Sequence, residues 1–375
     1  MILGMAQALY RRYRPKKLDE VLGQDTNTLI LKNAAKANRL GQAYIFYGPR
    51  GTGKTTTARL LAKLLNCEKR AADPAFAAIG EPCNECRSCR EIDAQNSFDV
   101  VEIDAASNRG IDEIRNLKES IKTSPAAAPH KVYIIDEAHM LTGAAFNALL
   151  KTLEEPPRHA AIILATTEYE KLPATITSRA QRFAFKRQSK ATIIKKLTGI
   201  AKAEKIQIDE PALELIAATA EGSFRDAESL LDQIASLSTD IDLPTAERAT
   251  GRTGAKKVHG LAEKIIKNEL KGALADVAAL ADEGTNLVQF TKDLIHYLRK
   301  VLALKVNPNL KAVLEKELTR DELALASGLA AETDARSLAA FLRDLIRAYG
   351  EMRYSPFAIV PLELTFVEHL SPRNE

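Results

Sequence analysis

A glycine-rich segment with the sequence GPRGTGKT, Gly48–Thr55, lies between a run typical of a β-strand and a run typical of a helix. The strand-like run covers 43–47 (AYIFY), and the helical composition extends over 56–65. Glycines in such a loop let backbone N–H groups face a phosphate at the amino terminus of a helix. The segment therefore predicts an α/β domain with a nucleotide-binding loop at the end of a strand.

The chemistry of this loop depends on a second apolar run, 132–135 (VYII), which is followed by Asp136 and Glu137. Its β-prone composition is typical of a strand buried on both faces. Lys54 is predicted to reach the β- and γ-phosphates, whereas Thr55 and Asp136 would hold Mg²⁺ and Glu137 would polarise the attacking water. The predicted phosphate-binding set is Gly48, Pro49, Arg50, Gly51, Thr52, Gly53, Lys54, Thr55 and Thr56. A glycine-rich turn without a ligand is the alternative.

Four cysteines predict a second site. Cys67 is followed by fifteen other residues and then by Cys83, Cys86 and Cys89 in a C-x2-C-x2-C pattern. In a reducing compartment this spacing suits tetrahedral zinc better than disulfides. An iron–sulfur cluster of the bacterial type needs its fourth cysteine after the triplet, and unligated thiols are the other alternative. Four cysteine ligands leave no open position for a catalytic water, so the predicted zinc site is structural.

Length and composition define the broad class. With 375 residues the chain can form two or three domains with separate cores. The net charge of +4 neither requires nor excludes nucleic acid, because binding depends on where lysine and arginine cluster. The first residues place positive charge after a short apolar stretch, the wrong order for a signal peptide, and no later run approaches a membrane span. We therefore expect a cytoplasmic protein.

Hydrophobic patterning predicts three domains. Strand-like runs at 100–103, 132–135 and 160–165 alternate with helical runs at 111–121 and 146–153, which indicates a mainly parallel sheet wrapped by helices. From about residue 185 the pattern is helical only, with helices at 191–202, 211–220 and 225–237 and a further block to the end. The predicted domains are 1–184, with the cysteine insertion at about 66–90, then 185–250 and 251–375.

Five further motifs carry a resemblance to a known family: YRRYRP at 10–15, VLGQ at 21–24, NALLKTLEEPP at 147–157, Ser178-Arg179, and GSFRD at 222–226. With these motifs the chain closely resembles the AAA+ ATPases of DNA sliding-clamp loaders, most strongly from about residue 8 to 235. The family usually carries cysteine after Ser-Arg, and Ala180 stands there instead. The resemblance implies a P-loop AAA+ domain with a parallel sheet and a zinc module, an all-helical lid, and an all-helical collar that oligomerises.

The resemblance also implies roles for single residues. Arg14, Pro15, Val21 and Leu22 would face the adenine of ATP. Thr167, or its neighbour Thr166, would sense the γ-phosphate, and Arg225 would reach the same nucleotide from the lid. Arg179 would point into the ATP site of the neighbouring subunit, where a guanidinium can neutralise charge on the transferred phosphoryl group.

The implied function is that of an ATP-hydrolysing motor subunit of the bacterial replicative clamp loader. Its partners would be other loader subunits in a ring, the sliding clamp, and primed DNA bound through its backbone. Ser107, Asn108 and Arg109 are candidate phosphate contacts, with a helix cap as the alternative. Members of the family often continue into a tail that binds the polymerase and helicase, and whether such a tail follows Glu375 is left open.

Three other readings share some of these motifs. Asp136-Glu137-Ala138-His139 is also the signature of DEAH helicases, but those need a second α/β domain where this chain has helices. Ring ATPases that migrate DNA junctions lack the four-cysteine insertion. Non-hydrolysing structural subunits of clamp loaders have degenerate phosphate loops, whereas Lys54, Thr55, Asp136 and Glu137 are all present.

Overall fold

The computed structural model describes residues 7–108, 111–250, 255–315, 318 and 320–370. The chain divides into two units, one of which holds the described residues up to Gln188 together with Ser223–Asp226. The other unit holds Ser189–Gly222 and the described residues from Ala227 onward. Among the described helices, none has both the length and the apolar character needed to span a membrane.

The first unit is built on a five-stranded parallel sheet in the order β2-β3-β4-β1-β5. Its strands are β1 (Ala43–Tyr47), β2 (Val100–Asp104), β3 (Lys131–Asp136), β4 (Ala160–Thr166) and β5 (Gln181–Ala184). Strand β4 lies between β1 and β3, with Thr166 beside Tyr47 and Leu164 beside Ile135. The carboxyl ends of these three strands therefore meet at one edge of the sheet.

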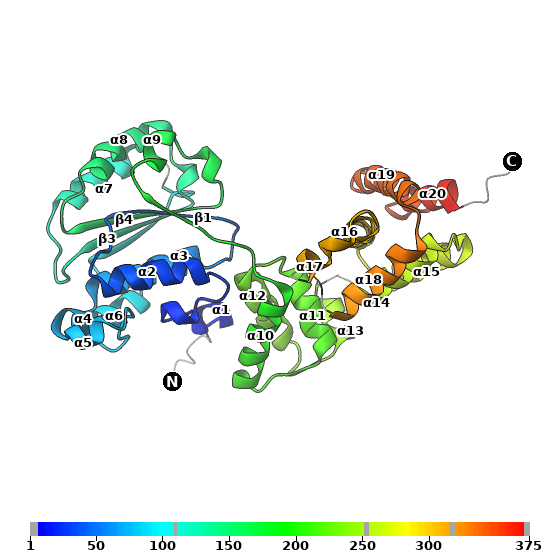
Figure 1. Cartoon of the computed structure of the whole chain (residues 1–375), viewed down its shortest axis with the longest axis horizontal. Coiled ribbons are helices and arrows are strands. Elements are labelled where there is room, and N and C mark those ends of the chain that lie inside the picture. Colours follow the sequence, from blue (N-terminus) through cyan, green and yellow to red (C-terminus); the bar gives the residue numbers. More distant parts are fainter. Residues whose placement is uncertain (1–6, 109–110, 251–254, 316–317, 319, 371–375) are drawn as a thin grey trace. The chain divides into compact units, whose positions relative to one another are not determined.

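Helices cover both faces of this sheet (Figure 1). Along β1 successive side chains point to opposite faces, so that Tyr44 and Phe46 pack with α2 (Asp25–Lys36) and α3 (Lys54–Asn66). Ile45 packs on the other side with α7 (Ile111–Lys122) and α8 (Gly143–Glu154). All seven residues of β4 are buried, as expected for a central strand of a sheet covered on both faces. The predicted parallel α/β architecture is confirmed.

The remaining elements of the first unit are short. They are α1 (Leu9–Arg12), η1 (Leu18–Glu20), α4 (Glu68–Ala72), α5 (Pro74–Ala77), α6 (Arg87–Asp93), η2 (Ala138–Met140), η3 (Tyr169–Lys171) and α9 (Ala174–Thr177). The sequence did not predict β5, because this four-residue edge strand buries only Phe183 and gives no continuous apolar run. The short helices of the cysteine segment were also not predicted.

A buried lysine joins the cysteine segment to the phosphate-loop helix. Lys63, on α3, is 1% exposed, and its Nζ lies 2.5 Å from Asp93 Oδ1 and 2.9 Å from Asn84 Oδ1. Asp93 is 39% exposed, so the ion pair is buried only at its lysine end. The segment is thus fixed against α3 by charge as well as by its apolar contacts.

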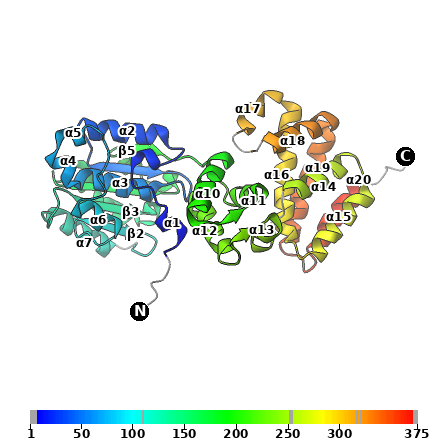
Figure 2. The same cartoon turned by 90° about the horizontal axis from the view of Figure 1, so that it is seen from below.

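The second unit begins with α10 (Lys190–Glu204), α11 (Glu210–Thr219), the continuation of α12 (Phe224–Ala235), and α13 (Leu243–Thr250), which lie together in Figure 2. The prediction of helices alone in this region missed one detail. Two-residue strands, β6 (Gln207–Ile208) and β7 (Asp240–Ile241), pair in parallel. Strands this short have no measurable alternation of hydrophobic residues in sequence.

The rest of the second unit is helical, in agreement with the predicted fold class. Its elements are α14 (Ala255–Ile266), α15 (Leu270–Asp282), α16 (Leu287–Val306), η4 (Pro308–Leu310), α17 (Lys311–Leu314), α18 (Arg320–Glu332), α19 (Ala335–Met352) and α20 (Ile359–Leu370). One apolar cluster runs through this block, and Phe290, Leu294, Leu298 and Val301 of α16 are at its centre. Their spacing is the i, i+4, i+8 pattern of a helix with one buried face.

Candidate active site

The phosphate loop adopts backbone conformations that favour glycine. Gly53 has φ +100° immediately before α3, and Gly51 has φ +71°. A Cβ atom on Gly51 would lie 1.8 Å from Ser223 Oγ, so the close approach of these two segments also requires glycine. Figure 1 places the start of α3 beside the end of β1. The loop thus leaves its backbone N–H groups at a helix amino terminus, where anions bind.

Lys54 is buried beneath this loop. Its Nζ donates hydrogen bonds to the carbonyl oxygens of Gly48 and Pro49, both at 2.8 Å. Burial lowers the pKa of Lys54, and the negative charges of Glu137 and Asp136 oppose that shift. A buried ammonium with two carbonyl contacts and two nearby carboxylates is suited to receive a phosphate that replaces the carbonyls.

The predicted magnesium ligands are in contact. Thr55 Oγ1 donates a hydrogen bond to Asp136 Oδ2 at 2.8 Å, although the two residues come from different segments of the sheet edge. A hydroxyl and a carboxylate at this edge are the oxygen ligands that Mg²⁺ takes in nucleotide sites.

Glu137 lies one residue beyond β3 with a positive φ of +47°. Its Oε2 accepts a hydrogen bond from the Thr167 hydroxyl at 3.0 Å. Thr166, in contrast, is fully buried and its hydroxyl faces His139. The structure therefore places Thr167, of the two candidate threonines, against the acidic pair. A hydroxyl has one proton, so Thr167 can donate either to Glu137 or to a phosphate, but not to both at once.

Two residues at this edge were missed from the sequence. Gln24 donates to the carbonyl oxygens of Thr52 and Lys186 and accepts from the Lys186 N–H, so it ties the phosphate loop to the segment after β5. It belongs to the VLGQ motif, which could have marked it. His139 contacts Glu137, Thr166 and Glu168, and only its place after the acidic pair could have drawn attention to it.

Of the residues predicted to face adenine, Val21 lies against the phosphate loop. Val21 Cγ1 lies 3.8 Å from the position of a Cβ on Gly53. Arg14, Pro15 and Leu22 are partly buried nearby in sequence. The guanidinium of Arg225 stacks over the Tyr10 ring at 5.1 Å. The Phe224 N–H donates to the Gly51 carbonyl oxygen at 3.1 Å, and this hydrogen bond joins the GSFRD motif to the phosphate loop.

Arg179 lies at the opposite edge of the sheet. It precedes β5, whose first residue pairs with Tyr44 near the start of β1, whereas the phosphate loop follows the end of β1. Strand rise alone separates the two ends of β1 by about 13 Å. Arg179 Nη2 lies 2.6 Å from Glu154 Oε1, and its Nη1 donates to Ser178 Oγ at 3.2 Å.

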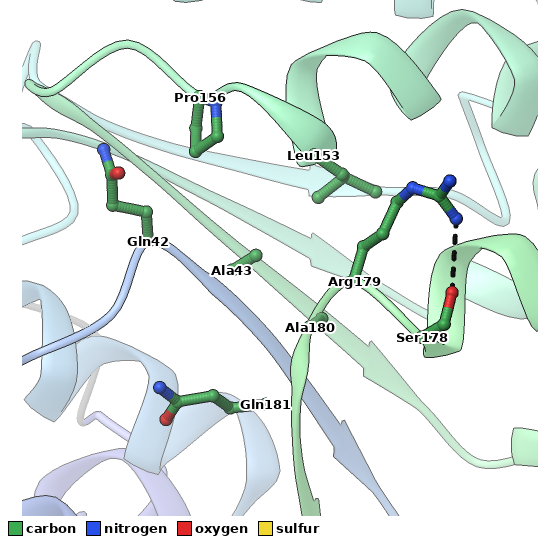
Figure 3. A pocket seen from close by; sticks show the side chains of 8 residues that line it. All are labelled: Gln42, Ala43, Leu153, Pro156, Ser178, Arg179, Ala180 and Gln181. Atoms are coloured by element: carbon green, nitrogen blue, oxygen red, sulfur yellow. Dashed lines mark hydrogen bonds between the residues drawn. The ribbon is translucent and has the colours of Figure 1, made fainter.

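A pocket of about 360 Å³ adjoins this arginine. Figure 3 shows Arg179 with its bond to Ser178, and Leu153 and Pro156 across the pocket. The lining residues are Gln42, Ala43, Leu153, Pro156, Ser178, Arg179, Ala180 and Gln181. Arg179 is thus one-third exposed and held at the surface, and the structure does not bring it to the chain's own phosphate loop.

The four cysteines converge as predicted. Their sulfur atoms all lie within 4.8 Å of one another, and Cys83 Sγ is 3.9 Å from Cys89 Sγ. Zinc–sulfur bonds of about 2.3 Å in a tetrahedron require sulfur atoms about 3.8 Å apart. Backbone N–H groups also point at the sulfurs, including Cys86 N–H to Cys83 Sγ at 3.2 Å. The donor set and its spacing fit a metal ion that prefers thiolates.

The candidate DNA contacts lie after β2. Ser107 Oγ lies 3.4 Å from Asp104 Oδ2, and the Asn108 side chain donates to the Asp104 carbonyl oxygen at 3.0 Å. Arg109 lies outside the described residues. Ser107 and Asn108 thus close a turn on Asp104 at the end of β2. The DNA contacts and the helix cap, the alternative raised from the sequence, both stay predictions.

Comparisons with known proteins give a consistent result over nearly the whole chain. Three family models match consecutive segments: "DNA polymerase III, delta subunit" at 23–189, "DNA polymerase III clamp loader subunit, ATPase lid domain" at 192–239, and "DNA polymerase III subunits gamma and tau domain III" at 241–371. Together with the strand order and the phosphate loop, they define an AAA+ ATPase of the clamp-loader class.

Individual relatives are more specific. The DNA polymerase III subunit tau of Bacillus subtilis is 42% identical over 363 residues, 96% of this chain and 63% of the relative. The subunit tau of Escherichia coli K12 is 35% identical over 97% of this chain and 55% of the relative. The chain belongs to the family of DNA polymerase III subunits gamma and tau, and it spans about half to two-thirds of the length of these relatives.

Solved structures that match part of this chain include the Bacillus subtilis DNA clamp loader delta protein, with a TM-score of 0.43 and 15% identity over 91% of this chain and 99% of that one. The Thermotoga maritima RuvB Holliday junction branch migration motor has a TM-score of 0.46 and 18% identity over 71% of this chain and 85% of that one. At these scores the likeness carries no argument about function.

Proposed function

We propose that this chain is an ATP-hydrolysing motor subunit of a bacterial clamp loader, which opens a sliding clamp and loads it onto primed DNA. The observation that carries the proposal is the convergence of a buried Lys54, a Thr55–Asp136 contact and a Thr167–Glu137 contact at one sheet edge. Family membership supports the same activity. A non-hydrolysing structural subunit would not need Glu137 so placed.

ATP and Mg²⁺ are the cofactors of this site. Lys54 and the N–H groups of the phosphate loop bind the phosphates, and Thr55 and Asp136 hold the magnesium ion, which neutralises charge on the phosphates. Glu137 orients and polarises the attacking water, while the Thr167 hydroxyl senses the γ-phosphate. Arg14, Pro15, Val21 and Leu22 face the adenine, and Arg225 reaches the same nucleotide from the lid.

Arg179 acts on a different nucleotide, the one bound by the neighbouring subunit. Its place at the amino edge of the sheet supports this role, because the chain's own phosphate loop is at the carboxyl edge. In the isolated chain Glu154 and Ser178 hold the guanidinium at the surface of the unit. Docking of a neighbour would exchange that contact for the phosphates of the neighbour's ATP.

The partners that follow are other loader subunits in a ring, the sliding clamp and primed DNA. The helical region 251–375 is the proposed oligomerisation collar, and 185–250 the lid. Ser107 and Asn108 contact the DNA backbone in this proposal, with Arg109 beside them. Binding through the backbone depends on salt and not on base sequence.

The decisive test of function is the dependence of hydrolysis on both substrates. The purified chain, assembled with a bacterial clamp and the remaining loader subunits, is expected to raise its ATPase rate only when clamp and primed DNA are added together. An ATPase rate that does not change when the clamp is added would contradict the proposal. So would a rate that rises with a DNA junction alone, which would favour another AAA+ ring ATPase.

The metal prediction is that Cys67, Cys83, Cys86 and Cys89 hold one Zn²⁺ in a structural site. Cys86→Ser should lose the metal and loosen the segment while leaving ATP binding within about twofold, because four-cysteine zinc is structural. Elemental analysis of metal per chain and limited proteolysis of the segment measure these effects. Lys63→Met is the control, since it should release the segment from α3 but keep the metal. Iron instead of zinc, or disulfides under reductant, would refute the assignment.

A further inference from the structure

His139 connects the acidic pair to the strand end that carries Thr167. It lies on η2, two residues after Glu137, and its side chain is 7% exposed. Its Nδ1 is 3.0 Å from Thr166 Oγ1 and 3.5 Å from Glu137 Oε2, and its Nε2 is 3.1 Å from Glu168 Oε1. The imidazole therefore contacts the residues on both sides of Thr167 in the sequence.

The partners of His139 define a closed ring of hydrogen bonds. The Glu168 carboxylate can only accept, so His139 Nε2 must carry a proton and donate to it. The Glu168 N–H donates to Thr166 Oγ1 at 3.1 Å, and the Thr166 hydroxyl can in turn donate to Nδ1. Each hydrogen bond of the ring then has a donor and an acceptor, with a proton on Nε2 and the Thr166 hydroxyl donating to Nδ1.

This ring is also tied to the phosphate loop. The Gly48 N–H donates to the Thr166 carbonyl oxygen at 3.2 Å. Thr166 is therefore bound twice, by His139 at its hydroxyl and by the phosphate loop at its backbone. Thr167 follows directly and donates to Glu137. A shift of His139 would therefore move Thr167 relative to Glu137 and to the first residue of the phosphate loop.

We propose that His139 is a positioning residue for ATP hydrolysis, which fixes the Thr166–Glu168 turn so that the Thr167 hydroxyl lies between Glu137 and the bound γ-phosphate. The proposal rests on the proposed ATPase function. His139 does not touch the nucleotide. It holds the Thr167 hydroxyl where that group can donate its hydrogen bond either to Glu137 or to the phosphate.

The first test is a spectroscopic signature that needs no activity. In the full chain labelled with ¹⁵N at histidine and kept at mildly alkaline pH, His139 Nδ1 should give the shift of an unprotonated nitrogen and Nε2 that of a protonated one. Glu168→Gln should alter the Nε2 shift. A proton on Nδ1 would overturn the ring, whether or not the protein hydrolyses ATP.

The second test separates positioning from mere packing. His139→Leu is expected to bind ATP within about twofold of the parent and to lose hydrolysis by about 10²-fold, the cost of a reacting group misplaced by about 1 Å. His139→Asn keeps an acceptor where Nδ1 stands and should recover most of that loss. His159→Leu is the matched control, because His159 is partly buried and its Nε2 lies 3.1 Å from Ile121 O, away from the acidic pair in the sequence. It should change hydrolysis by less than about twofold.

A double variant gives the sharpest outcome. If His139 acts through Thr167, the double variant His139→Leu/Thr167→Ala should hydrolyse ATP no more slowly than the slower of the two single variants. The Thr167 hydroxyl is already absent, so the loss of His139 has nothing further to misplace. Losses that multiply, or a His139→Leu enzyme with the parent rate, would overturn the proposal. A parent protein that does not hydrolyse ATP in an assembled loader would refute the proposed function instead, while the ¹⁵N result still decides the ring.

Discussion

Arg179→Ala is expected to reduce the ATPase rate of assembled complexes by about 10³-fold or more, the range attributed to arginines that stabilise the transferred phosphoryl group. ATP binding to the isolated chain should stay within about twofold, because Arg179 lies at the sheet edge opposite the phosphate loop. Equilibrium binding and steady-state hydrolysis measure the two effects. Arg182→Ala is the matched control, since Arg182 is an exposed arginine three residues along the same segment and contacts Tyr169.

Complementation tests whether the arginine acts between subunits. Arg179→Ala chains keep an intact phosphate loop and Glu137, and Glu137→Gln chains keep an intact Arg179. When the two inactive variants are mixed in one assembly, about a quarter of the head-to-tail contacts should join a complete ATP site to a complete arginine. Activity should then return. No recovery, or a full defect in isolated Arg179→Ala monomers, would show that Arg179 serves its own site.

Lys54→Ala and Glu137→Gln are expected to separate binding from chemistry. Lys54→Ala removes the buried charge that faces the phosphates and should abolish most ATP binding. Glu137→Gln keeps the size of the side chain but not its basicity, so ATP binding should be intact while hydrolysis falls by about 10²–10⁴-fold. Nucleotide binding and single-turnover hydrolysis measure both effects.

Two results would contradict these roles. Equal loss of ATP binding in both variants would show that Glu137 holds the nucleotide and does not act on water. A Glu137→Gln enzyme with nearly the parent rate would show that another group activates the water. Glu168, which contacts His139, would then be the next candidate for the base.

The parts of the site that depend on short continuous motifs could be predicted from the sequence. The phosphate loop and the acidic pair each follow a buried parallel strand, and parallel strands present their carboxyl ends at one edge, so Thr55 and Asp136 were expected to meet. The convergence of the four cysteines could be predicted from their spacing alone. The contact of Thr167 with Glu137 requires the end of β4 to lie beside the end of β3, and the sequence does not state that strand order.

Other features depend on contacts between segments distant in the chain. The pairing of Arg179 with Glu154, and the link from Gln24 to Lys186, follow from packing and leave no periodic pattern. The same holds for the contacts of His139, whose three partners lie just after β3, at the end of β4 and just after β4. Domain boundaries at 184 and 250, the lid arginine and the DNA contacts remain predictions.

The parallel sheet gives the first unit a direction. Its phosphate loop is at the carboxyl edge and Arg179 at the amino edge. If Arg179 acts on the neighbour's nucleotide as proposed, each copy receives an arginine at one edge and supplies one at the other. In the proposed head-to-tail ring the subunits follow one another in a single sense, and an arc that fails to close leaves one nucleotide without a neighbour's arginine and one arginine without a nucleotide. The break in such an arc would be a fixed, chemically silent position, distinguishable from every other contact around it.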